Sequence, residues 1–312
     1  MKTGSEEWRD AAVLQGLPGE WDPELRRRAF LSLCLLPALL ALSLVLVYPL
    51  FYNVYLSLSD AGVSHLRGSQ LSGFHQYAAV FGETEFWATF GRTVVWTLVC
   101  STLQIALGVF LAVILNQNFI RGRAAWRLLL LLPWAIPQYI TALTWRGMFN
   151  GEHGAVNSLL SAVGAGPVDW LTTPFAAFVA MMLVNIWMGF PFIMVIALTG
   201  LRAIPDSVYE AAQLEGASAW MQFTRLTAPL LRPVMLPATA LAIVWNFNNL
   251  NLVWLFSSGG QPDGKTHILV SYVYQNAFSY YRFGLAAALS VVIFVILFLF
   301  VQAFLQVSRW RR

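Results

Sequence analysis

The stretch DSVYEAAQLEGASAWMQFTRLTAPLLRP, residues Asp206–Pro233, is polar and helix-prone, although long apolar segments flank it on both sides. Ser207 and Glu210 have the S-x-x-E spacing of a capping box, which predicts that a helix begins here. The following residues are mostly good helix formers. Gly216 then stands where a helix end favours a residue that can adopt a positive φ. The first half of the stretch is therefore predicted to be a short helix that ends at a glycine.

The second half of the stretch predicts another short helix. Ser218 can begin it, and Pro229 and Pro233 are expected to stop it, because proline lacks the N–H that a helix interior needs. The product is a helix–glycine–helix elbow between two apolar segments. We interpret such an elbow as a docking surface.

The rest of the chain is typical of an all-α integral membrane protein. Of its 312 residues, 58% are hydrophobic and 11% are charged, and the mean hydropathy is +0.63. A helix needs about 20 apolar residues to cross the hydrocarbon core. Six charge-free gaps are long enough. They predict transmembrane helices over Phe30–Leu56, Val94–Leu115, Leu128–Trp145, Phe175–Leu198, Met235–Phe256 and Gly284–Phe304.

Two of these spans have features that affect packing. Gly108 and several small residues in the second span let membrane helices approach closely. Pro133 and Pro137 are two potential breaks in the third span, and proline is tolerated at that depth only where a neighbouring helix or a cavity satisfies the freed backbone groups.

The distribution of lysine and arginine predicts the orientation. With the N-terminus inside and six spans, 14 of the 19 basic residues lie on the inner side and five on the outer side. The positive-inside rule therefore places both termini and the elbow in the cytoplasm. The net charge of +4 is explained by this topology and does not indicate a nucleic-acid partner.

These observations divide the chain into four parts. Residues 1–28 are a cytoplasmic tail, and residues 29–91 are the first transmembrane helix with an external segment. Residues 92–306 are the core of spans two to six and include the elbow loop at 202–233, and residues 307–312 are the cytoplasmic C-terminus.

The cysteines and histidines indicate neither a disulfide framework nor a metal site. Cys34 and Cys100 both fall within predicted spans. The four histidines lie in external segments without ligand spacing, so we interpret them as ordinary surface residues: His65, His75, His153 and His267. We also find no nucleophile–base pair or buried carboxylate that would indicate a membrane enzyme.

Residues Gly259–Thr266 match the phosphate-loop expression G-x-x-x-x-G-K-[ST] letter for letter. That motif works only after a buried strand and before a helix, in a compartment that contains nucleotide. Here a membrane helix precedes it, and the topology places it outside. We therefore expect a turn between spans five and six.

A possible ligand site is formed by uncharged polar residues. No Asp, Glu, Lys, Arg or His lies in the middle of any span, which argues against an ion-coupled transporter. Aromatic and amide residues instead occur in three sets with i,i+4 spacing, so each set should share one helical face. The sets are Trp134 with Gln138, Asn185 with Gly189 and Phe192, and Trp245 with Asn246 and Asn249.

Amides beside aromatic rings suit a neutral polyhydroxylated ligand, because hydroxyls take the hydrogen bonds and the C–H faces of sugar rings pack on aromatic faces. The alternative is that the asparagines only connect helices, at roughly 0.6 kcal/mol per contact.

The elbow resembles the EAA loop of ABC-importer membrane subunits. The resemblance is carried by Glu210, Ala211 and Ala212, then by Gly216, Leu226 and Pro229 at the family spacing. It implies a type I ABC-importer permease fold and a loop that inserts into a cleft on a cytoplasmic ATPase subunit. It also implies that two such subunits bind ATP-Mg, whereas this chain holds no cofactor of its own.

Three further stretches are similar to the larger membrane subunit of maltose-type ABC importers in its shorter six-span form: LPWAIPQYI (Leu132–Ile140), VNIWMGFPF (Val184–Phe192) and WNFNNLNLVWLFSSGGQP (Trp245–Pro262). The sugar-contacting positions of that family fall on the eight residues of the three sets. Asn185, Gly189, Asn246 and Asn249 keep the family residue, whereas Trp134, Gln138, Phe192 and Trp245 depart from it.

This resemblance implies a multi-pass subunit in a bacterial or archaeal plasma membrane. Its partners would be a second, homologous permease subunit and an external sugar-binding protein, in addition to the ATPases and the lipid bilayer. The expected substrate is maltose, a maltodextrin or a related α-glucoside such as trehalose. The alternatives are another sugar, glycerol phosphate, or an autonomous facilitator that needs no ATPase.

Overall fold

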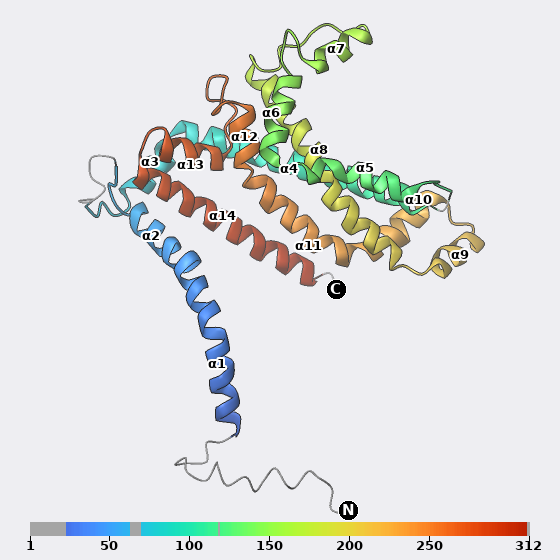
Figure 1. Cartoon of the computed structure of the whole chain (residues 1–312), viewed down its shortest axis with the longest axis horizontal. Helices are drawn as coiled ribbons and strands as arrows, with labels where there is room; N and C mark the ends of the chain where they lie inside the picture. The colour runs from blue at the N-terminus through green and yellow to red at the C-terminus, as the bar shows by residue number, and fades with distance from the viewer. Residues whose placement is uncertain (1–22, 63–69, 118, 311–312) are drawn as a thin grey trace, which may run out of the picture. The chain divides into compact units, whose positions relative to one another are not determined.

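The chain folds into helices joined by loops and turns. The structure, a computed structural model, describes residues 23–62, 70–117 and 119–310, and apart from one antiparallel bridge between Ser59 and Leu71 its regular elements in these ranges are helical (Figure 1). Five of the described helices are long and apolar enough to cross a membrane, or six if one bent pair counts as a single span. This agrees with the six spans expected from the charge-free gaps.

The chain forms two compact units, Met1–Asn53 and Val54–Arg312. The first unit contains α1 (Pro23–Leu42), a π-helical segment η1 (Ser43–Val47) and the start of α2 (Tyr48–Ser57). The expected cytoplasmic tail lies largely outside the described residues. Helix α1 already begins at Pro23, which is seven residues before the expected start of the first span.

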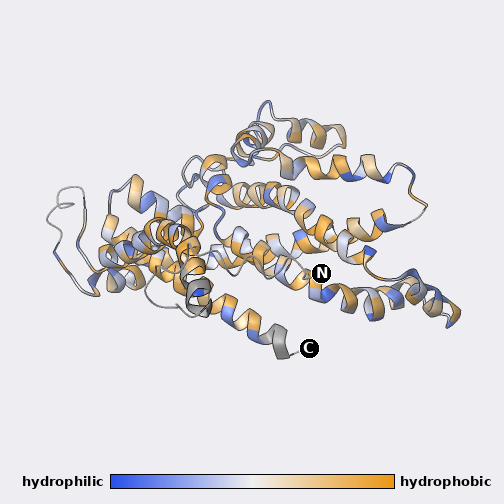
Figure 2. Ribbon diagram, turned by 60° about the horizontal axis from the view of Figure 1, so that its bottom comes forward, coloured by the Kyte–Doolittle hydropathy of each residue, from blue (hydrophilic) through white to orange (hydrophobic). Residues whose placement is uncertain are grey.

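The second unit contains the remaining helices, in which long apolar helices alternate with short polar connections (Figures 1 and 2). In chain order they are α3 (His75–Gly82), α4 (Thr84–Asn116), α5 (Arg123–Ala135), α6 (Gln138–Met148), α7 (Ala155–Ala162), α8 (Pro174–Arg202), α9 (Asp206–Leu214), α10 (Ala219–Gln222), η3 (Phe223–Thr227), α11 (Ala228–Phe247), α12 (Leu250–Phe256), α13 (Leu269–Phe278) and α14 (Phe283–Trp310).

Helices α4 and α8 form the centre of this unit and approach each other closely. A β-carbon added at Gly108 of α4 would lie 2.8 Å from Cβ of Ile193 and 2.9 Å from the backbone nitrogen of Met194, both on α8. Ile193 and Met194 are completely buried. The absence of a side chain at Gly108 therefore sets the distance between the two helices, as the small residues of the second span predicted.

The third span is not one helix but two. Helices α5 and α6 meet at an angle of 92°. Ile136, which precedes Pro137, has extended backbone angles (φ −79°, ψ 132°), because the proline ring disfavours a helical conformation of the preceding residue. Pro133 lies inside α5 and does not end it. Of the two potential breaks, only the one at Pro137 is realised.

The fifth span is also broken. Helix α11 ends at Phe247 and α12 begins at Leu250, so Asn248 and Asn249 lie between them. Asparagine favours such a position because its side chain can bond to nearby backbone groups in place of a helical partner. Here the Asn249 side chain accepts a hydrogen bond from the backbone N–H of Leu252 and caps α12.

The first helix of the elbow ends as predicted but does not begin as predicted. Its N-cap is Pro205 and no side chain caps it, so the expected capping box at Ser207 is wrong. A proline that precedes the first turn can fix the entry of the chain without a side-chain cap. At the other end Gly216 has φ +78°, and Ala217 N–H bonds to the carbonyl of Ala212 (2.9 Å), which confirms the glycine stop.

The second helix of the elbow begins as predicted but does not stop. Ser218 caps α10 by accepting a hydrogen bond from Met221 N–H (3.3 Å). Pro229 and Pro233 do not end the helix, because α10 continues through η3 into α11. Pro229 lies in the first turn after the π-helical segment, where proline is tolerated. Residues Ala219–Phe247 therefore form one continuous helical segment that consists of α10, η3 and α11.

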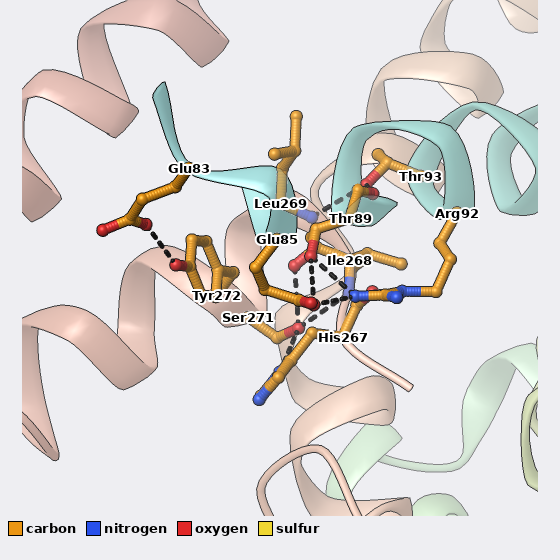
Figure 3. A network of polar contacts seen from close by, with 10 residues as sticks. All are labelled: Glu83, Glu85, Thr89, Arg92, Thr93, His267, Ile268, Leu269, Ser271 and Tyr272. Carbon is orange, nitrogen blue, oxygen red and sulfur yellow. Dashed lines mark hydrogen bonds and ion pairs between the residues drawn. The ribbon is translucent and has the colours of Figure 1, made fainter. Parts of the chain in front are cut away.

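The external end of the unit is fixed by a polar network between α4 and α13 (Figure 3). Arg92 of α4 donates from Nε to the carbonyl of His267 (3.1 Å) and also pairs with Glu85. Thr93 accepts from the backbone N–H of Leu269 at 2.8 Å. The preceding segment Gly259–Thr266 consists of turns after helix α12 rather than a phosphate loop after a strand. The expectation of a turn is confirmed.

His267 is not the surface residue that the sequence suggested. It is 2% exposed, its Nδ1 lies 3.1 Å from Ser271 Oγ, and its ring stacks on Trp254 with centroids 6.1 Å apart. Residues close in sequence surround the ring, since Tyr272 also lies beside it with centroids 6.3 Å apart and a β-carbon at Gly260 would collide with it. Arg92 of α4 adds only the hydrogen bond to the backbone carbonyl. The exposed positions of His75 and His153 agree with the expectation, and His65 lies outside the described residues.

The close approach of α4 and α8 predicts a difference between two glycines of one helix. Gly108→Ala should lower the free energy of unfolding by about 1–3 kcal/mol, because the added methyl group overpacks the interface. Gly91→Ala should leave stability unchanged or slightly raised, since nothing lies within 4 Å of its added β-carbon. Thermal unfolding of the purified variants checks this, and an equal loss at both positions would contradict the packing.

The burial of His267 predicts a pH dependence of stability. Burial and the neighbouring Arg92 lower the pKa of His267 from 6.5 to about 4, against a smaller opposing effect of Glu85. Between pH 7 and pH 5 the unfolded chain takes up a proton at this residue that the folded chain does not, so stability should fall by roughly 2 kcal/mol. Melting temperatures over this range should show the loss in the wild type and in His75→Gln, but a clearly smaller loss in His267→Gln.

Candidate functional site

Four buried amide residues line a cavity of about 540 Å³ in the second unit. All eight residues of the three predicted sets line it. The full lining comprises Gln104, Pro133, Trp134, Ala135, Ile136, Pro137, Gln138, Asn185, Met188, Gly189, Phe192, Ala242, Trp245, Asn246, Asn248, Asn249, Leu250 and Asn251. The cavity thus brings together residues from α4, α5, α6, α8, α11 and α12.

The two broken spans build this cavity. Trp134 belongs to α5 and Gln138 begins α6, so the 92° bend separates them. Trp245 belongs to α11, whereas Asn249 follows the break at Asn248. The expectation that each of these pairs shares one helical face is therefore wrong. The set Asn185, Gly189 and Phe192 does share a face, because all three residues lie on the continuous helix α8.

Asn246 is the centre of a hydrogen-bonded amide network. Its Nδ2 donates to Ser101 Oγ (2.9 Å) and Gln104 Oε1 (2.8 Å). Its Oδ1 accepts from Asn185 Nδ2 (2.8 Å) and Gln104 Nε2 (3.3 Å). These bonds use both donors and both acceptor positions of the side chain. Asn246 therefore joins α4, α8 and α11 and is 4% exposed.

The network continues from Asn185 across both breaks. Asn249 Nδ2 donates to Asn185 Oδ1 at 2.8 Å. Gln138 Nε2 in turn donates to Asn249 Oδ1, and Asn251 Nδ2 donates to Gln138 Oε1 at 3.4 Å. A chain of amides thus reaches from the buried helix contacts to the exposed side chain of Asn251.

Gln104 also lines the cavity and was missed by the sequence analysis. It is 3% exposed, and besides its bonds to Asn246 its Nε2 donates to the backbone carbonyl of Asn185 at 2.8 Å. A β-carbon at Gly189 would collide with this amide, so glycine is needed there for Gln104 to approach α8. One signal was available, since Gln104 is the only amide residue in the apolar stretch Val94–Leu115.

Aromatic side chains form the accessible wall of the cavity. Trp134 and Trp245 are 57% and 50% exposed, and the rings of Phe192 and Trp245 lie 4.9 Å apart at 56°. None of the described residues that line the cavity carries a charge. Flat aromatic faces beside amide groups can bind a neutral ligand that offers both C–H surfaces and hydroxyl groups.

We also searched the described residues for a metal-binding site. Among the described residues no group of three or more His, Cys, Asp or Glu side chains could hold a metal ion.

The elbow forms a second candidate site. Glu210 and Ala211 are exposed on α9, Ala212 is buried beneath them, and Gly216 forms the turn. Leu226 lies in η3 and Pro229 in α11. Next to them is a cavity of about 610 Å³, lined by Val113, Asn116, Gln117, Leu201, Asp206, Tyr209, Glu210, Gln213, Ala219, Gln222, Phe223 and Thr227.

Two large apolar side chains project from the largely polar outer surface of the elbow. Leu214 and Trp220 are 90% and 73% exposed, although the flanking residues are polar. Tyr209 and Thr227, whose hydroxyl oxygens lie 3.1 Å apart, connect α9 to η3. The elbow therefore presents large hydrophobic groups from a fixed helix pair, which is a typical feature of a protein-binding surface.

Comparisons with known proteins agree with this architecture. Residues 104–311 match the family described as "Binding-protein-dependent transport system inner membrane component". The chain is 34% identical over 283 residues to the trehalose/maltose transport system permease protein of Thermococcus litoralis, covering 90% of this chain and 94% of that protein. It is 35% identical over 272 residues to the galactooligosaccharides transport system permease protein of Bacillus subtilis, covering 83% of this chain and 65% of that protein.

The fold is shared with a solved transporter. A chain in the crystal structure of a bacterial alginate ABC transporter, in complex with an alginate pentasaccharide-bound periplasmic protein, superposes with a TM-score of 0.77 at 22% identity, covering 92% of this chain and 96% of that chain. This likeness establishes the type I importer fold. A multi-pass location in the plasma membrane agrees with that fold. The chain belongs to the family of inner membrane components of binding-protein-dependent transport systems.

Proposed function

We propose that the chain is a permease subunit of an ATP-driven importer for a neutral oligosaccharide, such as a maltodextrin or an α-glucoside like trehalose. The observation that carries this proposal is the uncharged cavity of aromatic and amide groups at the two broken spans. The relatives named for trehalose, maltose and galactooligosaccharides support the sugar class.

The structure suggests different roles for the cavity residues. Trp134, Phe192 and Trp245 offer exposed or partly exposed rings on which sugar faces can pack. Gln138 and Asn249 are the amides nearest to the open part of the network, so they are best placed to exchange hydrogen bonds with sugar hydroxyls. Asn246 has no free donor or acceptor position and acts by holding the helices in place.

The remaining function depends on partner subunits. A second permease would complete the pathway, and an external binding protein would deliver the sugar. Two cytoplasmic ATPase subunits would bind ATP-Mg and dock on the elbows through Leu214, Trp220 and the neighbouring residues of α9. ATP binding can drive transport only if it favours one state of the pathway over the other, since a ligand that binds both states equally shifts nothing.

Charged substrates fit the cavity less well. The fold is shared with an importer of alginate, an acidic polysaccharide, and glycerol phosphate is also an anion. A binding site for anions needs cations or oriented N–H groups to replace their hydration. The described lining residues include no basic side chain. We therefore favour neutral sugars over both anions.

The cavity predicts a difference between two tryptophans of α5. Trp134→Ala should reduce sugar uptake by roughly tenfold, because a lost aromatic contact costs about 0.5–1.5 kcal/mol in addition to the lost burial. Trp126→Ala is the matched control, since Trp126 is equally exposed (52%) but does not line the cavity. Uptake of labelled maltodextrins and trehalose into vesicles with the complete complex measures both.

Equal uptake by the wild type and Trp134→Ala over a series of α-glucosides would show that the cavity is not the sugar site. Stimulation of ATP hydrolysis by uronate oligomers but not by neutral sugars would disprove the proposed substrate class and leave the transport function intact.

The elbow predicts a specific loss of coupling. Gly216→Pro should abolish sugar-stimulated ATP hydrolysis for two reasons. Proline cannot adopt φ +78°, and it has no N–H to replace the one that Gly216 donates to the carbonyl of Gln213. Gly216→Asn should retain much of the activity, since asparagine tolerates the left-handed conformation. Membrane insertion should be normal in both variants. Wild-type stimulation of ATP hydrolysis in Gly216→Pro would refute the docking role of the elbow, whereas sugar uptake without any ATPase would indicate an autonomous facilitator.

A further inference from the structure

A cluster of arginines lies at the predicted cytoplasmic ends of α5 and α8. Arg123 and Arg127 are one helical turn apart on α5, and Arg202 is the last residue of α8, against which α5 packs. Arg123 and Arg202 are the charged groups whose fields act on Arg127, and both are cations. Three positively charged side chains thus lie near one another at this end of α5 and α8.

Two of these arginines, Arg127 and Arg202, form no ion pair with a carboxylate among the described residues. The Nε atom of Arg127 is buried and has no hydrogen-bond acceptor. A buried guanidinium N–H without an acceptor is costly, so an acceptor from outside the chain would stabilise this arrangement.

The residues that follow on α5 are apolar and exposed. Leu128, Leu129 and Leu132 are 68%, 53% and 48% exposed, and Trp126 beside Arg127 is 52% exposed. Tryptophan is enriched at the boundary between headgroups and hydrocarbon, and basic residues near it lie at the depth of lipid phosphates. The charged and the apolar parts of α5 thus match the two parts of a phospholipid.

We propose that this cluster binds the headgroup of an anionic phospholipid from the cytoplasmic leaflet. The phosphate oxygens would accept hydrogen bonds from the guanidinium groups of Arg127 and Arg202, including the buried Nε of Arg127. The acyl chains would lie along Leu128, Leu129 and Leu132. The apolar surface directly beside the arginines favours a lipid over free phosphate, which would leave that surface exposed to water.

The site lies between two elements that carry function. Arg202 ends α8, the helix that bears Asn185 and Gly189, and α9 of the elbow begins four residues later at Asp206. A bound headgroup would hold the cytoplasmic end of α8 against α5. The proposal stands on the arginine cluster alone and does not require that the substrate be a sugar.

Native mass spectrometry of the purified full-length chain tests the proposal directly. Titration with phosphatidylglycerol and phosphatidylcholine should show preferential retention of the anionic lipid. Arg127→Gln combined with Arg202→Gln should weaken that retention by about fivefold for each arginine removed. Arg225→Gln is the matched control, because Arg225 is an exposed cytoplasmic arginine on the elbow outside the cluster. Arg127→Lys with Arg202→Lys should retain an intermediate preference.

Several results would overturn the proposal. An equal loss in Arg225→Gln would show a diffuse charge effect without a defined site. Displacement of phosphatidylglycerol by millimolar inorganic phosphate would show a site for soluble phosphate. Unchanged lipid selectivity in the double glutamine variant, with weaker association of a partner subunit, would show that a protein surface occupies the cluster. Melting temperatures measured in phosphatidylcholine ensure that all variants compared are folded.

Discussion

The structure depends on the complete hydrogen bonding of one amide, that of Asn246. Its four bonds to Ser101, Gln104 and Asn185 join α4, α8 and α11 where the amide itself is buried. An unpaired amide in that environment would cost about as much as several packing contacts contribute, so the three helices can adopt only arrangements that keep the set together. The close approach at Gly189 serves the same bonds, because any side chain there would displace Gln104.

This network explains why two breaks in the backbone occur beside the cavity. The chain leaves the helical conformation at Ile136 and again at Asn248 and Asn249, and each break frees backbone groups from their helical partners. Such irregular backbone is tolerated in a membrane only where it is buried in protein or lines a polar cavity. The cavity and the breaks therefore require each other. At the second break, Asn248 and Asn249 bond to the backbone groups of Val244 and Leu252, and both asparagines line the cavity.

The sequence predicted the features that depend on local chemistry. Charge-free length located the spans, the positive φ at Gly216 followed from a glycine at a helix end, and the combination of amide and aromatic residues identified eight residues that share one cavity. It failed where distant contacts decide the structure. Gln104 forms its contacts with α8 and α11 only through residues more than 80 positions away, and the carbonyl of His267 accepts from Arg92, 175 positions away. All residues of the three sets line one cavity. In two of the sets, however, the residues do not share a helical face, because they meet across a break between two helices.

The failure of Pro229 and Pro233 to stop the elbow's second helix has a mechanical consequence. A stop there would have separated the elbow from the cavity by a non-helical joint. The structure instead continues from Ala219 to Phe247 as one helical rod, which bears the exposed Trp220 at one end and Trp245 and Asn246 at the other. Helix α8 provides a second connection, since it bears Asn185 and leads into α9 within four residues of its end. Rigid elements transmit displacement between distant sites, whereas flexible joints absorb it. Two helices, α8 and α11, thus lead from the elbow to the cavity, and each bears a member of the amide network, Asn185 on α8 and Asn246 on α11.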